Sequence, residues 1–257
     1  MIFKRRIHDE IKEWKELDDG RTALLIEGAR RVGKTTVAIE FAKAEYKSYI
    51  IVDFSEVGDD VLEIFNNLSS NLDLFFQRLQ LAYNTKLHER NSVIIFDEVQ
   101  MFPKARQMIK PLVKDHRYDY IETGYLVSLR KNIAKIRIPS EEHPLEMHPM
   151  DFEEWLWARD NEVGFEMLKE LLESKTPLGL HTHKALMEEF KTYMVVGGMP
   201  QAVERFIETN DIMSAERIKE VLYGLRLVGH SNRQLELALA EQAHVDQVLL
   251  VLESEGC

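Results

Sequence analysis

Continuous apolar runs alternate with stretches whose apolar residues recur every three to four positions over the first 150 residues. The runs predict buried strands, and the helical spacing predicts helices that cover both faces of a sheet. This β-α alternation is typical of an α/β fold with a parallel sheet. The expected strands are 22–27, 47–54, 92–97, 118–123 and 145–150, and the expected helices are 7–17, 35–44, 60–68, 72–83 and 104–116.

Beyond residue 150 the apolar spacing is helical throughout. Asp151 has the residue type that caps a helix N-terminus, and acidic residues follow it in the first turn. The glycine pair that starts at Gly197 would stop one helix, and Pro200 would open the next. The pattern predicts an α/β core over 1–150 and a helical region over 151–225. The expected helices are 152–158, 162–173, 184–194, 200–209 and 213–224.

Composition narrows the class of protein. With 257 residues, 45% hydrophobic and 30% charged, the chain is expected to be soluble and to form one large domain or two smaller ones. No apolar run has the length of a membrane span, and Cys257 is the only cysteine, which fits a cytoplasmic protein. The net charge of −11 disfavours broad nucleic-acid binding. A local basic cluster leaves nucleic acid open: Arg130, Lys131, Lys135 and Arg137.

The pattern Gly-x-x-x-x-Gly-Lys-Thr follows the first expected strand directly and precedes a helix. Gly28 and Gly33 allow turns in which successive N–H groups point at phosphate oxygens. Lys34 suits the β- and γ-phosphates, and the Thr35 hydroxyl suits Mg²⁺. A chance match is the alternative, but strand, loop and helix occur in the required order. The residues expected to bind the nucleotide are Gly28, Ala29, Arg30, Arg31, Val32, Gly33, Lys34, Thr35 and Thr36.

Two further strand ends carry polar residues. Asp97 and Glu98 end the strand 92–97, where Asp97 would hold Mg²⁺, mostly through water, and Glu98 would polarise the attacking water. A buried strand followed by an acidic turn is the alternative. Thr123 ends the strand 118–123, and its hydroxyl would touch the γ-phosphate or the water; an ordinary strand-to-glycine turn is nearly as well supported. The predicted catalytic residues are therefore Glu98, Lys34 and Thr123, and the predicted metal ligands are Thr35 and Asp97.

Five segments together carry a family resemblance: G-A-R-R-V-G-K-T-T, I-I-F-D-E-V-Q, I-E-T-G-Y, M-H-P-M-D-F-E-E-W-L-W-A and Y-M-V-V-G-G-M-P-Q-A-V. Over about residues 4–225 the chain resembles the bacterial and archaeal AAA-type ATPases that carry a C-terminal region designated DUF4143. The resemblance implies ATP and Mg²⁺ as ligands, an AAA-type P-loop core and a helical lid after it. It also implies the same roles for Lys34, Thr35, Asp97 and Glu98.

The chain departs from this family at two places. Tyr125 stands where members usually have serine, which weakens the case for Thr123 as a sensing residue. Residues 226–257 no longer resemble the family, which usually continues with a nuclease-like domain, so we expect a substitute tail there. Its apolar positions would form an amphipathic helix or an exposed apolar face that promotes self-association.

Other clusters are interpreted as structure rather than as sites. The aromatic residues Phe152, Trp155 and Trp157 are expected to pack within the helical region, and Glu153 and Glu154 are expected to lie on a solvated helix face. Four histidines have spacings that match no tight metal motif. These are His143, His148, His181 and His183.

Three functions remain open on sequence grounds. The favoured one is a Mg²⁺-dependent ATPase, whose site a homo-oligomer would complete with an arginine such as Arg130 or Arg137. The second is an ATP-gated binding module with negligible turnover. The third is an ATPase that works on DNA, which the acidic balance disfavours. Arg30 and Arg31 would contact nucleotide or solvent.

Overall fold

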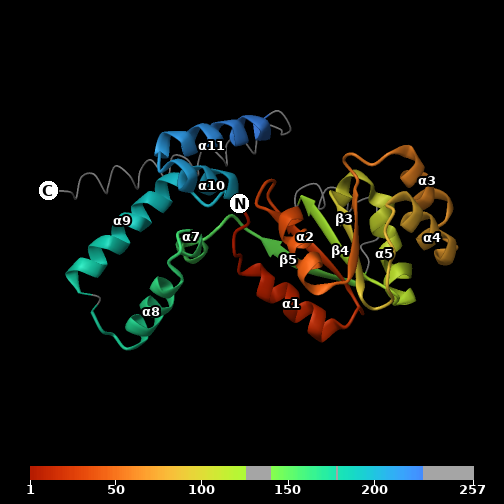
Figure 1. Cartoon of the computed structure of the whole chain (residues 1–257), viewed down its shortest axis with the longest axis horizontal. Helices are drawn as coiled ribbons and strands as arrows, with labels where there is room; N and C mark the ends of the chain where they lie inside the picture. Colours follow the sequence, from red (N-terminus) through yellow and green to blue (C-terminus); the bar gives the residue numbers. More distant parts are fainter. Residues whose placement is uncertain (126–139, 178, 228–257) are drawn as a thin grey trace. The chain divides into compact units, whose positions relative to one another are not determined.

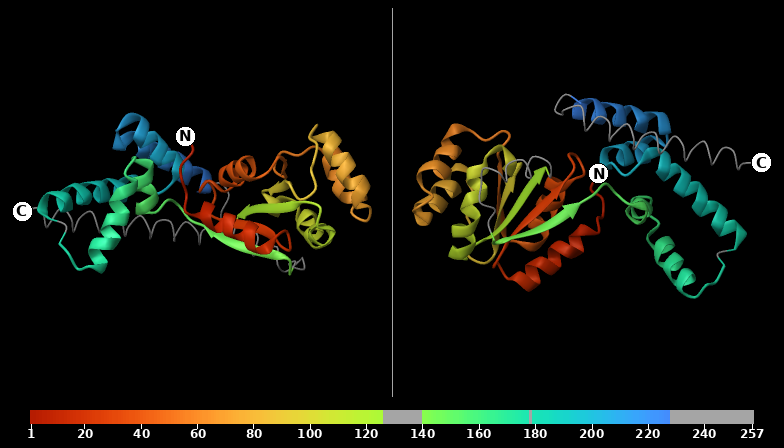
Figure 2. Two further views of the ribbon diagram at one scale, coloured as in Figure 1. Left: turned by 60° about the horizontal axis from the view of Figure 1, so that its bottom comes forward. Right: turned by 180° about the vertical axis from the view of Figure 1, so that it is seen from behind.

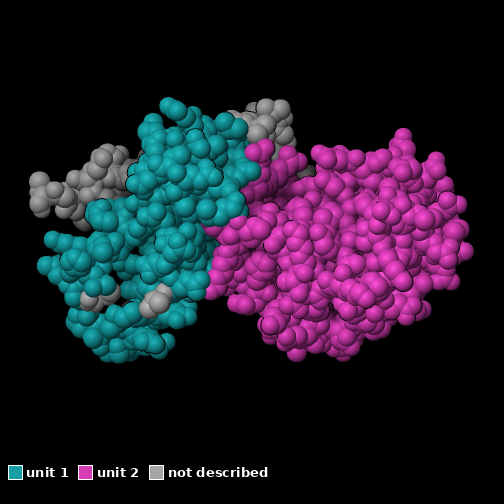
Figure 3. Space-filling model, viewed as in Figure 1, with its two compact units in different colours: residues 1, 149–257 teal, residues 2–148 magenta. Residues whose placement is uncertain are grey.

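The computed structural model describes residues 1–125, 140–177 and 179–227. The chain divides into two compact units, residues 2–148 and residues 149–257 with residue 1 (Figure 3). The basic residues Arg130, Lys131, Lys135 and Arg137 and the tail 228–257 lie outside the described residues. Among the helices of the described ranges, none is both long and apolar enough to cross a membrane.

Five parallel strands form the sheet of the unit at residues 2–148, in the order β2-β3-β4-β1-β5 (Figure 1). Because β4 lies between β1 and β3, the carboxyl ends of these three strands are adjacent at one edge of the sheet. Ligands of parallel sheets bind beyond this edge. The strands are β1 Ala23–Gly28, β2 Ser48–Asp53, β3 Ser92–Asp97, β4 Asp119–Tyr125 and β5 Glu142–Met147.

Helices cover both faces of this sheet, and each strand sends alternate side chains to either face. Even-numbered residues of β3 and β4 face α3 (Asp59–Asn67), α4 (Leu72–Ala82) and α5 (Pro103–Asp115), where they join a large apolar core. The opposite face is covered by α1 (Ile7–Asp18) and α2 (Lys34–Glu45) (Figure 2). A short 3-10 helix, η1 (Val99–Met101), follows β3. The parallel sheet and its covering helices confirm the predicted α/β class.

One strand was predicted three residues too far toward the C-terminus. The apolar pattern placed the fifth strand at 145–150, whereas β5 spans Glu142–Met147. Pro144 lies inside it, opposite Leu25 of β1. A proline is tolerated there because β5 is an edge strand, with one side not needed for pairing. The other four predicted strands agree with the observed ones to within two residues at each end.

The unit that begins at residue 149 is helical over its described residues, as the apolar spacing predicted. Three predicted ranges coincide with observed helices, while the ranges 184–194 and 213–224 are longer in the structure. Beyond residue 150, α7 (Phe152–Ala158) starts at the expected cap: the Asp151 carboxylate accepts a hydrogen bond from the Glu154 N–H at 2.9 Å, and the Glu154 carboxylate accepts one from the Asp151 N–H at 3.3 Å. The helices are α7 Phe152–Ala158, α8 Glu162–Glu173, α9 Leu180–Val196, α10 Pro200–Thr209 and α11 Ile212–Leu227.

Aromatic packing holds α7 against α9 and α10. The fully buried Trp155 ring stacks on Phe206 with centroids 5.5 Å apart and lies 5.8 Å from Tyr193. Phe152 contacts the Phe190 ring edge-on at 5.1 Å. These contacts confirm the packing interpretation for Phe152 and Trp155.

The prediction for the neighbouring glutamates was wrong. Glu153 and Glu154 are buried rather than solvated. Glu154 is buried because its carboxylate belongs to the helix cap, and Glu153 faces Lys169 of α8 with 3.6 Å between carboxylate and ammonium. The periodicity could not show this burial, since it depends on which helix packs against α7.

The consecutive glycines Gly197 and Gly198 end α9 and also allow a close backbone contact. Gly197 has φ 76° where α9 ends. The carbonyl of Gly198 accepts a hydrogen bond of 2.7 Å from the Met150 N–H, and a Cβ on Gly198 would lie 2.0 Å from the Met150 carbonyl oxygen. Only glycine permits this backbone approach, which joins two segments far apart in the sequence.

Candidate functional site

The expected phosphate-binding loop lies between the end of β1 and the start of α2. A Cβ on Gly28 would lie 2.1 Å from the Met147 carbonyl oxygen on β5, so the loop leaves the sheet through a space that only glycine fits. Gly33 has φ 101° immediately before α2, and Arg31 also has a positive φ, 66°. These turns leave the N-terminus of α2, with its partial positive charge, at the loop.

Lys34 is buried beside this loop, with 6% of its surface exposed. Its ammonium donates to the carbonyl oxygens of Ala29 at 2.7 Å and of Gly28 at 3.4 Å. Burial lowers the pKa of Lys34, and the negative charges of Glu98 and Asp97 oppose that shift. The structure therefore concentrates a cation and two carboxylates around the loop.

Asp97 is the centre of a cluster of oxygen atoms from three elements. The Thr35 hydroxyl of α2 donates to its two carboxylate oxygens at 2.8 and 3.0 Å, and the Thr123 hydroxyl of β4 donates to Asp97 Oδ1. Asp97 and Thr123 are both buried. Carboxylate and hydroxyl oxygens are the donors that Mg²⁺ prefers, so the chemistry of these residues fits that ion.

Glu98 follows Asp97 and leaves the strand in a left-handed conformation, with φ 52° and ψ 43°. Its backbone N–H donates to the Thr123 hydroxyl oxygen at 3.3 Å. Such a conformation is uncommon for a residue with a Cβ and is found disproportionately at functional sites. Glu98 is half-buried and directly follows β3, at the carboxyl end of the sheet where the loop also lies.

The remaining loop residues differ in exposure. Val32 is fully buried, Ala29 is half-buried, and Arg30, Arg31 and Thr36 are exposed. The Arg30 guanidinium carbon lies 5.5 Å from the centroid of the Tyr125 ring at the end of β4. Tyr125 thus contacts the loop through a cation–π interaction.

Sequence reasoning missed two polar residues at this edge. Arg5 is buried, and its guanidinium donates to the Val32 carbonyl of the loop at 2.8 Å and to the His148 carbonyl at 2.7 Å. Gln100, in η1, donates to the Glu98 carboxylate and accepts from the Tyr125 N–H at 3.2 Å. Nothing in the sequence distinguished Arg5 from the other residues of its basic run. The one signal for Gln100 was its position two residues after the acidic residue Glu98.

A second charged cluster lies on the opposite face of β4. Arg106 of α5 makes a bidentate pair with Glu142 of β5, at 2.7 Å from Nε and 2.6 Å from the terminal nitrogen. Glu122 of β4 is fully buried, and within the described residues neither of its carboxyl oxygens has a hydrogen-bond partner. Burial, and then the negative charge of Glu142, raise the pKa of Glu122 well above its usual range.

The histidines do not converge on a metal site. His143 faces Asp18 at 3.6 Å, and His148, His181 and His183 are exposed. Over the described ranges, no group of three or more histidine, cysteine, aspartate or glutamate side chains is arranged to hold a metal ion.

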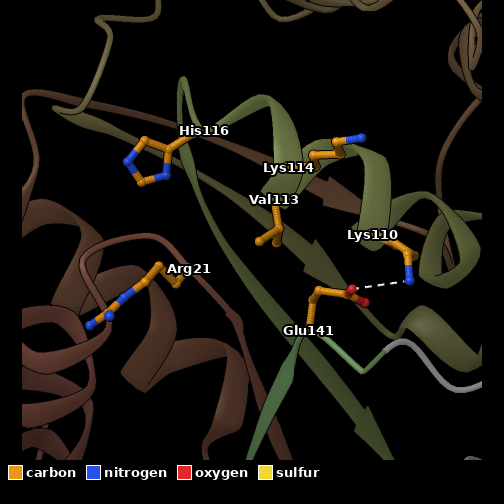
Figure 4. Close-up of a pocket in the computed structure, with 6 residues that line it drawn as sticks. All are labelled: Arg21, Lys110, Val113, Lys114, His116 and Glu141. Atoms are coloured by element: carbon orange, nitrogen blue, oxygen red, sulfur yellow. Dashed lines mark ion pairs between the residues drawn. The ribbon is translucent and has the colours of Figure 1, made fainter.

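A surface pocket of about 360 Å³ lies at the other end of the strands (Figure 4). Its lining residues lie on α5 or within three residues before β1, β4 or β5, whereas the expected phosphate-binding loop follows β1. Lys110 pairs with Glu141 there at 3.2 Å. The pocket is lined by Arg21, Lys110, Val113, Lys114, His116 and Glu141 and is separate from the site at Gly28–Thr36.

Comparisons with known proteins bear on the family and the fold of this chain. The model of a family described as an AAA domain matches residues 20–156, just over half of the chain. The fold is similar to that of the Walker-type ATPase of Pyrococcus abyssi, at 16% identity and a TM-score of 0.52, covering 95% of this chain and 77% of that one. A signal-transduction ATPase with numerous domains and a tetratricopeptide-repeat sensor, from Pyrococcus horikoshii, matches at 17% identity and a TM-score of 0.42, over 82% of this chain and 30% of that one.

A search of curated protein sequences gave no match. At these identities the solved structures bear on the fold alone. The fold is that of an α/β P-loop nucleoside triphosphatase with helices after the core.

Proposed function

The chain belongs to the AAA domain family, and on that premise we propose that it binds ATP with Mg²⁺ and hydrolyses the terminal phosphoanhydride bond. The observation that carries this proposal is the convergence of Thr35, Asp97, Thr123 and Glu98 through direct hydrogen bonds. Thr35, Asp97 and Thr123 lie on α2, β3 and β4, and Glu98 directly follows β3. The negative charges of Asp97 and Glu98 act on the buried Lys34.

Each residue has a role that follows from its chemistry. Lys34 and the loop N–H groups would neutralise the β- and γ-phosphates, and Thr35 and Asp97 would hold Mg²⁺. When bound, Mg²⁺ would supply positive charge beside the phosphate oxygens. Glu98 accepts a hydrogen bond from the attacking water and orients it in line with the γ-phosphate. Thr123 contacts the water or the γ-phosphate from β4.

The test compares ATP binding and phosphate release for the wild-type chain, Lys34→Ala and Glu98→Gln. Lys34→Ala should lose ATP binding, because the buried cation beside the loop is removed. Glu98→Gln should keep ATP binding but stop release, because an amide is a poor acceptor for the water proton. Matched controls are Lys43→Ala, on the exposed side of the same helix, and Glu63→Gln on α3, both of which should behave as wild type.

The same experiment separates the leading alternative, an ATP-gated binding module with negligible turnover. The alternative predicts that Lys34→Ala abolishes ATP binding while all three chains release phosphate only at the background rate. That result would reject hydrolysis and favour the binding module. In that case ATP would stabilise the fold by mass action alone. Release from Glu98→Gln at the wild-type rate would instead remove Glu98 from the proposed mechanism.

The wider assignments rest on the resemblance of the sequence. We propose that residues 151–225 form a lid-like helical region of the kind found with DUF4143, after an ATPase core of residues 1–150. A homo-oligomer would supply an arginine in trans; the candidates Arg130 and Arg137 lie outside the described residues. Action on DNA is disfavoured by the charge of −11, and stimulation of phosphate release by duplex DNA is its test.

A further inference from the structure

The side chain of Gln100 is held at both ends. It lies in η1, two residues after Glu98, and only 9% of its surface is exposed. Its amide nitrogen donates to Glu98 Oε2, and its amide oxygen accepts from the Tyr125 N–H at 3.2 Å. A glutamine amide holds its NH2 donor group and its oxygen acceptor in one plane, so a contact at each of them defines the orientation of the amide.

Glu98 needs such a contact for its orientation to be defined. Its backbone is fixed by the left-handed turn, but its side chain is half-buried and keeps rotamer freedom. A buried donor on Oε2 restricts that freedom and leaves Oε1 as the oxygen for another ligand. Hydrogen bonds to charged groups are also stronger than neutral ones.

The other end of Gln100 reaches the strand that carries Thr123. Tyr125 follows Thr123 by two residues on β4, and its ring contacts Arg30 of the phosphate loop. Thr123 in turn accepts from the Glu98 N–H. Gln100 therefore joins the Glu98 carboxylate to the end of β4, beside the loop.

We propose that Gln100 is a positioning residue for ATP hydrolysis, which orients the Glu98 carboxylate toward the attacking water by anchoring it to β4. This inference rests on the proposed function. Gln100 contacts neither phosphate nor water in this mechanism and acts through Glu98. Loss of the anchor should therefore reduce turnover without reducing ATP affinity.

The test measures kcat, KM and ATP affinity for three variants of the full chain. Gln100→Met keeps the side-chain length but removes both hydrogen bonds. Gln100→Glu keeps an acceptor for the Tyr125 N–H but cannot donate to Glu98 when ionised. Gln107→Met, an exposed position on α5, is the control. We expect kcat to fall about 10- to 100-fold in both Gln100 variants, with KM, ATP affinity and the thermal midpoint near wild type.

The possible failures are distinguishable. If either Gln100 variant turned over ATP at the wild-type rate, this inference would be overturned and the proposed function would stand. A fall in kcat matched by lost ATP affinity or a lower thermal midpoint would also overturn it, because it would indicate a structural role. Absence of phosphate release from the wild-type chain would overturn the proposed function and this inference with it.

Discussion

Replacing the buried Glu122 with glutamine should make the protein more stable at high pH. Glu122 has a raised pKa because it is buried near Glu142, so the folded chain keeps its proton at pH values where the unfolded chain has lost it. The favourable contribution of protonated Glu122 to the free energy of unfolding is fully present below the pKa of the unfolded state. This contribution is lost as the pH rises through the pKa of the folded state. Glu122→Gln keeps the shape of the protonated acid and cannot ionise.

The size of this effect follows from one proton. Between the unfolded-state pKa of about 4.3 and the raised folded-state pKa, the folded chain holds up to one more proton than the unfolded chain. The wild-type free energy of unfolding should therefore fall, relative to the variant, by up to about 1.4 kcal/mol for each pH unit in this window. Over two pH units the difference would reach up to about 3 kcal/mol, a large part of the stability of an ordinary domain.

Urea unfolding followed by circular dichroism measures this difference from about pH 5 to about pH 8. The control is Glu146→Gln, an exposed position on β5, which should follow the wild-type curve. A difference between Glu122→Gln and wild type that stays constant over this range would refute the reasoning, because it would mean that Glu122 does not change its proton binding on unfolding. A difference that grows as the pH falls would refute the sign of the pKa shift.

Substitutions at three other positions test the phosphate-loop turn, a helix cap and the aromatic packing. Gly28→Ala places a Cβ 2.1 Å from the Met147 carbonyl oxygen, so it should lower the free energy of unfolding by about 1–3 kcal/mol and weaken ATP binding. Thermal unfolding with and without ATP measures both effects. An unchanged thermal midpoint would mean that β5 shifts to accommodate the methyl group. Asp151→Ala removes the α7 cap and should cost about 1 kcal/mol in urea unfolding, whereas Asp151→Asn should cost less. Trp155→Ala should cost about 3–5 kcal/mol, because the ring is fully buried against Phe206; a loss below 1 kcal/mol in urea unfolding would contradict this packing.

Local signals in the sequence predicted most of the elements. The phosphate loop was predicted because a strand, a glycine-rich loop and a helix follow one another within a short segment, where residue types dictate backbone conformation. The acidic pair at Asp97 was placed at the same edge because carboxyl ends of parallel strands share one edge. Helix ends such as the Asp151 cap were also local.

The exceptions depended on the tertiary environment of each residue. The bounds of β5 were predicted wrongly because a strand accepts a proline such as Pro144 only at the edge of a sheet, and the edge position of β5 is a property of the tertiary structure. Glu153 and Glu154 were assigned to solvent because the first faces α8 and the second folds back onto its own cap, neither of which periodicity reports.

The sequence by itself therefore determined the α/β class, and it predicted the phosphate loop and the polar residues at the strand ends, since each depends on a few consecutive residues. Only the tertiary structure decided that Thr123 contacts Asp97, because that contact requires β4 to lie next to β3. It also decided that Gln100 holds Glu98 and that Glu122 is buried without a partner among the described residues. Such contacts join residues far apart in the chain or depend on burial, and neither leaves a periodic signal in a single sequence.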